Sequence, residues 1–343
     1  MMPDAISRAG HSSEATYATP LFVSAAVSQQ VLSFPEMIAA LRRAYSVPHG
    51  QRVSPPRVVA RDQGIWFRAL AACPPGSRYM GAKIFGLGRS KTVSYLIALF
   101  EQETGALAAL VDGNLVTAYR TAATSAVAFD RLAPAETRTL AVIGSGLEAQ
   151  MHARAFATVR KFSAMRVFSP NAENRDAFAR TLGADLGIEI TAVDSPETAV
   201  TGADAVVAAA RSYDETPILL GRWLRPDMTV VSIGSTLPDH REIDEDVVQV
   251  CDLIVCDVVD EVLKDTGDML AAKAAGIAVE DKCISLNELM TESVPERVAS
   301  ARLPMFKSAG ASIQDIVVAE LAVHKAVEAE LATKSDLNFL MKA

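Results

Sequence analysis

The second half of the chain alternates short apolar runs with amphipathic stretches. From about residue 134 onward, each run is followed by a stretch in which apolar side chains recur at helical spacing. Strands that alternate with helices in this way favour a parallel sheet with helices on both faces. The runs that we predict as strands are TLAVIG (residues 139–144), AMRVFS (164–169), IEITAV (188–193), DAVVAAA (204–210), MTVVSIG (228–234) and CDLIVCD (251–257).

The first half follows a different pattern. Ser33 and Glu36 have the spacing of a capping box and predict a helix through Tyr45. A run rich in alanine and threonine at residues 117–133 and the final stretch at residues 312–332 also have helical spacing. The remaining runs predict strands separated by turns rich in proline and glycine. They are LFVSA (residues 21–25), the extended SPPRVVAR (54–61), GIWFRALAA (64–72), YMGAKIFG (79–86) and a hairpin over residues 93–113.

The composition is that of a globular protein. The chain has 343 residues, 50% of them hydrophobic and 22% charged, which suggests two domains. A formal net charge of −8 argues against a nucleic-acid partner, because phosphate neutralisation requires a basic face. No apolar run is long enough to span a membrane, and the polar N-terminus lacks a signal-peptide pattern. The four cysteines form no C-x-x-C pair, so we expect a reduced, cytoplasmic protein without a membrane partner, and we assign no metal site.

A glycine motif joins the first of the second-half strands to a helix. Gly144, Gly146 and Ala149 form the pattern G-x-G-x-x-A. Glycines let the backbone turn tightly and approach a pyrophosphate, whose charge is favoured at a helix N-terminus. Leu147 and Glu148 lie in the first turn of that helix, beside the expected cofactor. The alternative is a glycine-rich turn that holds no ligand. The pattern predicts an α/β fold in which a Rossmann-type parallel-sheet domain accompanies an α+β domain.

The end of the second strand bears on the choice of cofactor. NAD enzymes usually carry an acid there for the ribose 2′-hydroxyl. This chain has Ser169 and Asn171 instead, with Arg175 nearby. Because hydroxyl and amide groups donate hydrogen bonds to a 2′-phosphate, we expect NADP(H) to be preferred, with NAD(H) as the alternative. The simpler interpretation is that Ser169 and Asn171 form only a turn and an N-cap.

Five stretches extend from about residue 50 to 320: GAKIFG, DGNLVTAYRTAATSAVA, LAVIGSGLEAQMHARAF, SIGSTLPDHREID and LPMFKSAGASIQD. Together they resemble the ornithine cyclodeaminase/μ-crystallin family. The pairing of AYRTAATSA with the glycine motif that follows it is specific to that family, whereas the glycine motif alone is not.

The resemblance implies a fold, a class of reaction and an assembly. Members act mostly on small α-amino or α-imino acids with a nicotinamide cofactor, by cyclising ornithine, dehydrogenating alanine or reducing cyclic ketimines. The polar N-terminus predicts a flexible leader at residues 1–19. After it, the resemblance implies a substrate-binding and dimerisation domain at 20–132 plus 311–343, and a Rossmann dinucleotide-binding domain at 133–310. The family is usually homodimeric.

Three basic residues match the family's carboxylate site: Arg57, Lys83 and Arg120. Arginine forks hold carboxylates in two-point geometry, which suits a substrate with a carboxylate beside the reacting carbon. The alternative for each is a surface charge or a structural ion pair. Lys83 is also a candidate proton donor to the imine nitrogen, provided that burial and neighbouring cations lower its pKa.

The stretch SIGSTLPDHREID departs from the family pattern. Aligned on Pro238 and Glu242, it has Thr236 where cyclodeaminases and alanine dehydrogenases carry an Asp that acts on the substrate amine, and Asp239 is not an obvious substitute. Ketimine-reducing members also lack this Asp. Thr236 therefore favours imine reduction, with its hydroxyl as a hydrogen-bond partner, over ornithine cyclisation.

Several other positions follow from the same resemblance. Cyclodeaminases carry Glu near Arg68, and an Arg there suits a second carboxylate or a neutral side chain, unless Arg68 faces solvent. Glu148 stands where the family often has Gln. Ser308 matches a position near cofactor and substrate. The positions that match the cofactor surroundings are Thr92, Arg120, Thr121 and Gly234.

The residues and the resemblance together lead to one principal function. We expect an NAD(P)H-dependent reductase or dehydrogenase of a small α-imino or α-amino acid, for example of Δ1-pyrroline-2-carboxylate to proline. Lys83 and Thr236 are its catalytic candidates. The alternatives are an ornithine cyclodeaminase that converts L-ornithine to L-proline and ammonia, and a non-catalytic protein that binds NADP(H) and a small carboxylate.

Overall fold

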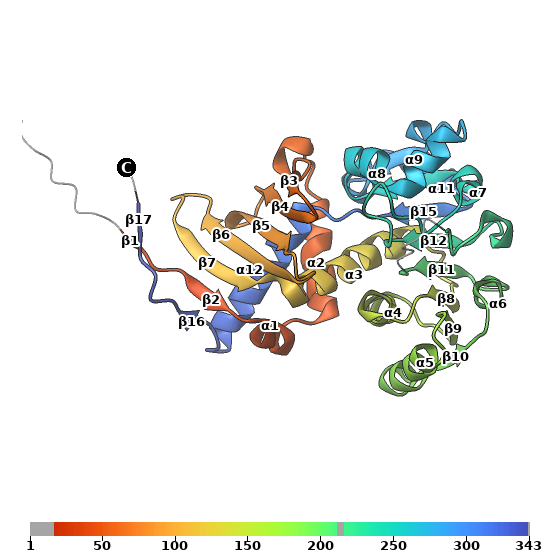
Figure 1. Ribbon diagram of the computed structural model, residues 1–343, viewed down its shortest axis with the longest axis horizontal. Helices are drawn as coiled ribbons and strands as arrows, with labels where there is room; N and C mark the ends of the chain where they lie inside the picture. The colour runs from red at the N-terminus through yellow and green to blue at the C-terminus, as the bar shows by residue number, and fades with distance from the viewer. Residues whose placement is uncertain (1–16, 211–215, 342–343) are drawn as a thin grey trace, which may run out of the picture.

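The computed structural model describes residues 17–210 and 216–341. Two sheets organise these residues, and they lie side by side along the long axis of the molecule (Figure 1). The leader expected at residues 1–19 lies mostly outside the described residues. At its end, β1 (Tyr17–Ala18) pairs antiparallel with β17 (Phe339–Leu340).

The second sheet has eight parallel strands in the order β10-β9-β8-β11-β12-β15-β13-β14. The six predicted strands are all present, and this confirms the α/β fold with a Rossmann-type sheet. The strands are β8 (Thr139–Ile143), β9 (Ala164–Phe168), β10 (Glu189–Ala192), β11 (Ala205–Ala208), β12 (Thr229–Ser232), β13 (Leu253–Cys256), β14 (Cys283–Ser285) and β15 (Pro304–Lys307).

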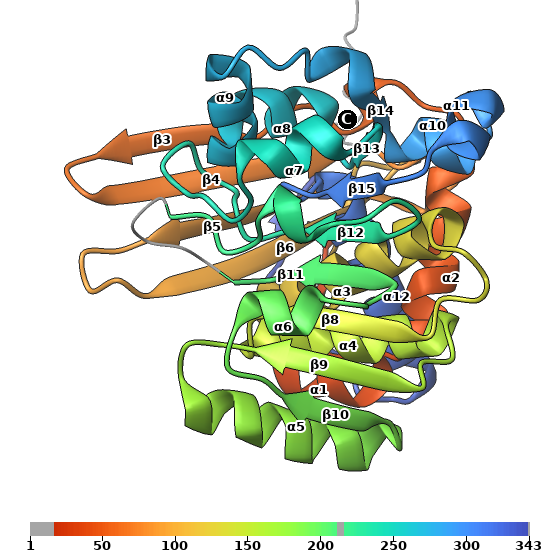
Figure 2. The same ribbon diagram turned by 90° about the vertical axis from the view of Figure 1, so that its right-hand side faces the viewer.

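Successive residues of these strands enter two different cores. Leu140 and Val142 pack with the helices on one face, and Ala141 and Ile143 pack with those on the other. A strand that is buried on both faces is continuously apolar, which is why these runs were visible in the sequence. Figure 2 shows α6, α7, α8 and α9 in front of the sheet and α3 and α4 behind it. The helices of this half are α4 (Leu147–Val159), α5 (Ala172–Leu186), α6 (Pro196–Val200), α7 (Glu245–Val250), α8 (Val259–Asp265), α9 (Gly267–Ala274), α10 (Leu286–Met290) and α11 (Pro295–Ser300), with 3-10 turns at Gly221–Trp223 and Glu280–Lys282.

The first sheet is mostly antiparallel and has the order β16-β2-β7-β6-β5-β4-β3. The C-terminal helix α12 packs against it, beside α2 and α3 (Figure 1). The chain thus returns to its first half after the parallel sheet is complete. The elements are β2 (Leu21–Val23), α1 (Ala25–Val31), α2 (Phe34–Tyr45), β3 (Val58–Asp62), β4 (Ile65–Ala72), β5 (Tyr79–Leu87), β6 (Val93–Glu101), β7 (Leu107–Asp112), α3 (Gly113–Leu132), α12 (Ser312–Glu328) and β16 (Thr333–Lys334), with a 3-10 turn at Gln51–Val53.

The sequence patterns predicted most of these helices and strands, but the structure differs from the prediction at a few of them. Helix α2 runs from Ser33 as N-cap to Tyr45, but the Ser33 hydroxyl donates to the Glu36 carboxylate (2.6 Å) rather than capping a backbone N–H. Helix α3 begins earlier than expected, because the Asp112 side chain accepts from the Asn114 N–H and caps it. Strands β14 and β15 were not predicted from the sequence. Among the described helices, none combines the length and apolarity that a membrane crossing requires.

Candidate functional site

The glycine motif forms a tight turn at the carboxyl end of β8. Gly144 has φ +116°, and a Cβ there would lie 2.6 Å from the carbonyl oxygen of Ala209, which follows β11. The turn lies where the strand order reverses, between β8 and β11, and ligands of open α/β sheets bind in such crevices. The two strands thus form the mouth of a dinucleotide site.

The start of α4 fits a pyrophosphate. Gly146 is the N-cap of this helix, and among the described residues no side chain caps it, so the first-turn N–H groups face the turn. Within the described part of the chain, no atom would lie within 4 Å of a Cβ on Gly146, which leaves room for a ligand against the backbone. Leu147 is exposed and Glu148 is half-buried at this end of the helix.

Ser169, Asn171 and Arg175 come together in the turn after β9. The Asn171 side chain accepts from the Asn174 N–H at 2.9 Å, so the N-cap interpretation is correct for this residue. Arg175 donates to the Ser169 carbonyl at 3.0 Å and pairs with Asp194 at 2.5 Å. Because Asp194 is exposed, this ion pair contributes little to stability, and Arg175 can exchange Asp194 for another anion.

Lys83, Arg120 and Asp315 form the most deeply buried charge cluster of the first half. Lys83 comes from β5, Arg120 from α3 and Asp315 from α12, and all three are less than a tenth exposed. Lys83 Nζ donates to Asp315 Oδ1 at 2.8 Å, and Arg120 Nε donates to the same oxygen at 2.9 Å. Asp315 Oδ2 is buried and has no hydrogen-bond partner among residues 17–210 and 216–341. Two cations and one half-satisfied carboxylate therefore share one site.

Asp315 was not singled out from the sequence. It lies in the stretch SIQD, and an acid on the apolar face of an amphipathic helix was the available signal. Arg120 also donates from Nη1 to Gln314 Oε1 at 2.7 Å. Two nitrogens of this guanidinium, Nε and Nη1, therefore form hydrogen bonds with side chains at the start of α12.

The environment of Lys83 suits proton transfer. Burial lowers the pKa of Lys83 to about 8, Asp315 opposes the shift, and the positive charge of Arg120 adds to it. This is the direction that a proton donor working near neutral pH requires.

Arg57 is paired with an acid that was also missed. Its Nε donates to Glu261 Oε2 at 2.9 Å, its Nη2 contacts the same oxygen, and its backbone N–H donates to Glu261 Oε1 at 2.5 Å. Nη2 also donates to the carbonyl of Ala309 at 2.7 Å. Because Glu261 lies on α8, this pair joins the two halves of the molecule, and the structural ion pair is the state that the structure shows.

The loop after β15 closes over Arg120. Ser308 is buried and its hydroxyl donates to Asp257 Oδ2 at 2.6 Å, while the Gly310 N–H donates to the same oxygen at 2.7 Å. Gly310 has φ +89°, and a Cβ on it would lie 3.0 Å from Arg120 Nη1. Glycine therefore allows the backbone to lie directly on the guanidinium, and Ser308 fixes the loop.

The loop after β12 is held by a second buried network. Glu242 accepts from the Gly234 N–H at 2.9 Å, from the Ala210 N–H at 3.0 Å and from the Ser232 hydroxyl at 2.7 Å. Burial raises the pKa of Glu242 to about 7, which Lys307 opposes. Thr236 is half-buried in the loop that this network fixes. Glu242 was visible in the sequence only as an alignment anchor.

Two residues that we predicted near the cofactor, Thr121 and Thr92, form hydrogen bonds with residues close to them in sequence. Thr121 is adjacent to Arg120 on α3 and its hydroxyl donates to the Thr117 carbonyl at 2.8 Å. Thr92 is exposed in the β5–β6 turn, where its hydroxyl is 2.8 Å from that of Ser90.

Arg68 does not face solvent, so the solvent-facing interpretation of this residue is wrong. It is 7% exposed and lies opposite Phe85 in the β4–β5 ladder. In the same ladder Leu70 lies opposite Lys83, so Arg68 and Lys83 share one face of the sheet. The Arg68 guanidinium carbon lies 4.6 Å from the centroid of the Trp66 ring.

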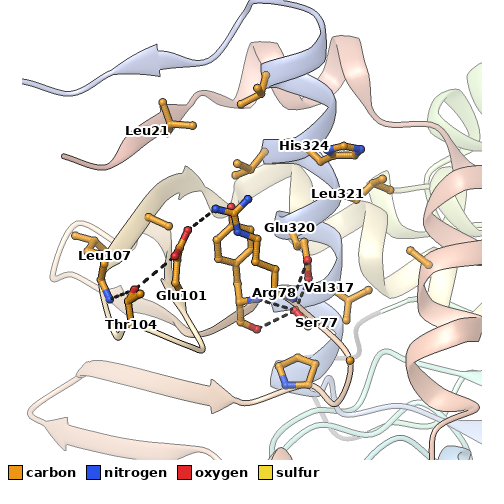
Figure 3. Close-up of a pocket in the computed structure, with 18 of the residues that line it drawn as sticks. Leu21, Ser77, Arg78, Glu101, Thr104, Leu107, Val317, Glu320, Leu321 and His324 are labelled. Carbon is orange, nitrogen blue, oxygen red and sulfur yellow. Dashed lines mark hydrogen bonds and ion pairs between the residues drawn. The ribbon is translucent and has the colours of Figure 1, made fainter. Parts of the chain in front are cut away.

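A large cavity lies elsewhere. It has a volume of about 1040 Å³, and β6, β7, α2 and α12 contribute to its walls (Figure 3). None of the predicted site residues lines it. The lining residues labelled in Figure 3 include Leu21, Leu107, Val317, Leu321 and His324. None of these five lies near the glycine turn in sequence. The buried cluster around Lys83, and not this cavity, is therefore the candidate active site.

The glycine turn at the switch point and the buried basic cluster define a dinucleotide-binding α/β protein with a separate α+β half. The model for the "Ornithine cyclodeaminase/mu-crystallin family" matches residues 25–330, and the chain belongs to this family.

Relatives and solved structures with this fold carry several imine-reducing names. The chain is 30% identical to the ketimine reductase mu-crystallin of Mus musculus over 316 residues, covering 88% of this chain and 96% of the relative. It is 31% identical to the iminosuccinate reductase of Paracoccus denitrificans over 239 residues, covering 68% and 72%. The structure of Thermococcus litoralis Δ1-pyrroline-2-carboxylate reductase with NADH and L-proline matches with a TM-score of 0.84 and 27% identity, covering 92% of this chain and all of that one.

Proposed function

We propose that this protein is an NAD(P)H-dependent reductase of a small α-imino acid. Hydride goes to the imine carbon and a proton to the nitrogen, so that the C=N bond becomes the C–N bond of an amine, as in the conversion of Δ1-pyrroline-2-carboxylate to proline. The observation that carries the proposal is the buried Lys83 ammonium, held with Arg120 on one oxygen of Asp315. The names of the relatives, among them ketimine, iminosuccinate and pyrroline-2-carboxylate reductases, support it.

The residues of the glycine turn fit a nicotinamide dinucleotide. Gly144 and Gly146 would hold the pyrophosphate together with the free N–H groups at the start of α4, next to Leu147 and Glu148. When bound, the cofactor supplies the hydride. We propose that NADP(H) is preferred, because the turn after β9 has no acid at residues 169–171 and brings together Ser169, Asn171 and Arg175.

Basic residues hold the substrate carboxylate in this proposal. Arg120 and Lys83 lie side by side at Asp315, and Arg57, from the segment before β3, contacts the Ala309 carbonyl of the loop that lies on Arg120, so the carboxylate binds among them. A substrate carboxylate at Arg57 competes with Glu261 for the same guanidinium. Ser308 and Gly310 keep the loop on Arg120 and exclude water from this side.

Lys83 provides the proton in the proposed mechanism. With a pKa of about 8 the ammonium is mostly protonated at neutral pH, and it gives up its proton more readily than an exposed lysine does. Thr236, on the loop fixed by Glu242, contributes a hydroxyl as a hydrogen-bond partner for the substrate nitrogen.

One observation favours a second candidate, ornithine cyclodeaminase. Thr236 cannot serve as the carboxylate that this reaction needs near the amine. Asp315 Oδ2, however, is a buried carboxylate oxygen without a partner in the described part of the chain. A substrate amine at this oxygen would supply the missing contact. A protein that binds NADP(H) and a carboxylate without turnover is the third possibility.

Oxidation of NADPH and NADH by the purified protein separates these functions. The panel contains cyclic ketimine acids, and linear 2-oxo acids with ammonia or methylamine. L-ornithine with NAD is scored by ammonia release. Ketimine turnover with NADPH preferred supports the proposal. Ammonia from ornithine contradicts it and assigns the cyclodeaminase activity, whereas cofactor binding without turnover of any member supports the binding protein.

We also propose a homodimer and two domains. The face of the first sheet opposite to Lys83 carries Phe22, Phe67 and Val58, which are 40%, 51% and 71% exposed. A second copy would cover these apolar side chains, and light scattering on the wild type and on Phe67→Asp tests this.

The proposed domains are residues 20–132 with 311–343, which bind the substrate and form the dimer, and residues 133–310, which bind the cofactor. The four cysteines are free thiols, which supports a reducing compartment such as the cytoplasm.

A further inference from the structure

We propose that Arg68 binds a second carboxylate of the substrate, so that the preferred imino acid is dicarboxylic. The inference rests on the proposed imine reductase function and adds the class of side chain that the site accepts. Arg68 is 7% exposed, and its Nε is buried without a hydrogen-bond partner among the described residues. A guanidinium in this condition lacks the anion that would normally accompany it in a protein interior.

The contrast with the neighbouring cations is clear. Lys83 and Arg120 share Asp315, and Arg57 is held by Glu261. Within residues 17–210 and 216–341, no carboxylate oxygen lies within 4.0 Å of the Arg68 guanidinium. Each other buried cation of the site is thus paired, and Arg68 is the one that a ligand has yet to neutralise.

The aromatic rings around Arg68 hold its guanidinium in place but provide no hydrogen-bond acceptor for its N–H groups. Its guanidinium carbon lies 4.6 Å from the centroid of Trp66 and 5.9 Å from that of Phe85. Stacking on an aromatic face uses the flat side of a guanidinium and leaves its N–H edge free for a planar acceptor. Burial lowers the pKa of Arg68 to about 10, and the positive charges of Arg57 and Arg61 add to the shift. A carboxylate at the N–H edge would stabilise the positive charge of Arg68 and raise its pKa again.

Arg68 is also in the right place. Lys83 Nζ lies 5.3 Å from the centroid of the same Phe85 ring, so both cations are within 6 Å of one side chain. They lie on the same face of adjacent strands, displaced by two residues along the ladder. An imino acid whose nitrogen is at Lys83 therefore extends its side chain toward Arg68. A carboxylate is the group that a guanidinium fork binds in two-point geometry.

The chemistry of the reaction is unchanged by this assignment. Hydride adds to the imine carbon, one proton adds to the nitrogen, and the product is an amino dicarboxylic acid. The substrate is the imine of a 2-oxo dicarboxylic acid, and a reaction that condenses such an acid with an amine, or oxidises the corresponding amino acid, supplies it.

Steady-state kinetics with paired substrates test the proposal. Oxaloacetate and 2-oxoglutarate are compared with pyruvate and 2-oxobutyrate, each with ammonia or methylamine, for the wild type, Arg68→Gln and Arg68→Lys. Loss of one charge-assisted pair predicts a KM that is about 10- to 100-fold higher for the dicarboxylic imines of Arg68→Gln, with little change for the others. Arg68→Lys recovers part of the loss. Arg43→Gln, which removes an exposed arginine from helix α2, is the matched control and leaves both classes unchanged.

A structural role for Arg68 makes different predictions. If the guanidinium only stabilised the fold, Arg68→Gln would lower Tm and impair all substrates equally, and that result overturns the proposal. We expect Tm to be maintained or raised, because the variant removes an unpaired buried charge. Equal KM values for mono- and dicarboxylic imines in the wild type also overturn it.

A binding measurement separates this inference from the proposed function. Trp66 contacts Arg68, and the chain has two tryptophans, so Trp223→Phe leaves Trp66 as the single tryptophan, which is excited selectively over the tyrosines. In this background L-aspartate or L-glutamate should change the Trp66 emission at concentrations at which L-alanine does not, and Arg68→Gln should abolish the difference. If no imine is turned over but this difference is present, the reductase fails and the Arg68 subsite stands. If monocarboxylic imines are reduced and the difference is absent, the reductase stands and the subsite fails.

Discussion

Lys83 Nζ lies 2.8 Å from Asp315 Oδ1, although 232 residues separate the two in sequence. The pair joins the centre of the first sheet to the last helix of the chain. Because Arg120 donates to the same oxygen, one carboxylate sets the position of two cations that we assign to the substrate. Changes at either cation or at Asp315 should therefore affect the whole cluster.

Replacing Lys83 by Met should affect catalysis more than binding. Removal of a proton donor typically costs about 10²- to 10⁴-fold in rate. We expect kcat for a ketimine acid to fall in this range while KM changes less than tenfold, as measured by NADPH oxidation. A large KM increase with kcat preserved would show instead that Lys83 only binds the substrate.

Replacing Asp315 by Asn should destabilise the fold. The variant leaves Lys83 and Arg120 buried without an anion, and breaking a buried pair in this way costs about 3–5 kcal/mol. Urea unfolding followed by circular dichroism measures the change. Asp185→Asn is the matched control, because it breaks the exposed pair with Arg154 and should cost about 0–1 kcal/mol. Similar values for the two variants would contradict the role of Asp315.

The rate of imine reduction should fall as the pH rises through about 8. The proposed donor is the protonated form of Lys83, whose pKa is about 8, so the fraction able to donate decreases above that pH. The kcat profile of the wild type should bend there, and the profile of Lys83→Met should lack the bend. Stability changes in the opposite sense. The folded lysine releases its proton before the unfolded one, whose pKa is about 10.5, so this group's contribution to stability rises from pH 8 to 10.5.

Replacing Ser169 by Asp should shift the cofactor preference toward NAD(H). A carboxylate in this turn repels a 2′-phosphate and accepts from a ribose 2′-hydroxyl. We expect KM for NADPH to rise about tenfold or more relative to NADH, as kinetics with both cofactors would measure. Arg175→Gln should weaken NADPH in the same direction. An unchanged ratio in both variants would remove the basis for the NADP(H) preference.

Two glycine variants should separate folding from cofactor binding. Gly144→Ala places a Cβ 2.6 Å from the Ala209 carbonyl at a positive φ, so we expect it to lower Tm. Gly146→Ala meets no atom within 4 Å, so it should keep the wild-type Tm but lose affinity for the dinucleotide. Thermal unfolding and calorimetric titration with NADPH measure the two effects. Retention of full affinity by Gly146→Ala would contradict the placement of the pyrophosphate.

Local patterns were sufficient for most of the elements and for the glycine turn after β8. The six strands of the parallel sheet are continuously apolar because both faces are buried, and β8 shows this directly, since Leu140 and Ala141 enter different cores. The glycine motif is equally local as a sequence signal, because it lies directly between an apolar strand and a helix, although the atom that excludes a Cβ at Gly144 is the remote carbonyl oxygen of Ala209. The basic residues Arg57, Lys83 and Arg120 were found by type and resemblance.

The charge partners were decided only by the tertiary structure. Glu261 lies 204 residues from Arg57, and nothing in either local sequence indicates that they meet. Asp315 was likewise hidden in an amphipathic helix. Strand alternation could not tell which face of β4 carries Arg68, and the structure places this residue on the buried face together with Leu70 and Ala72. The sequence determines which groups can be charged and which backbones can turn, because both are properties of neighbouring residues. Only the packed fold decides which charge is neutralised, because pairing depends on distances between segments that are remote along the chain.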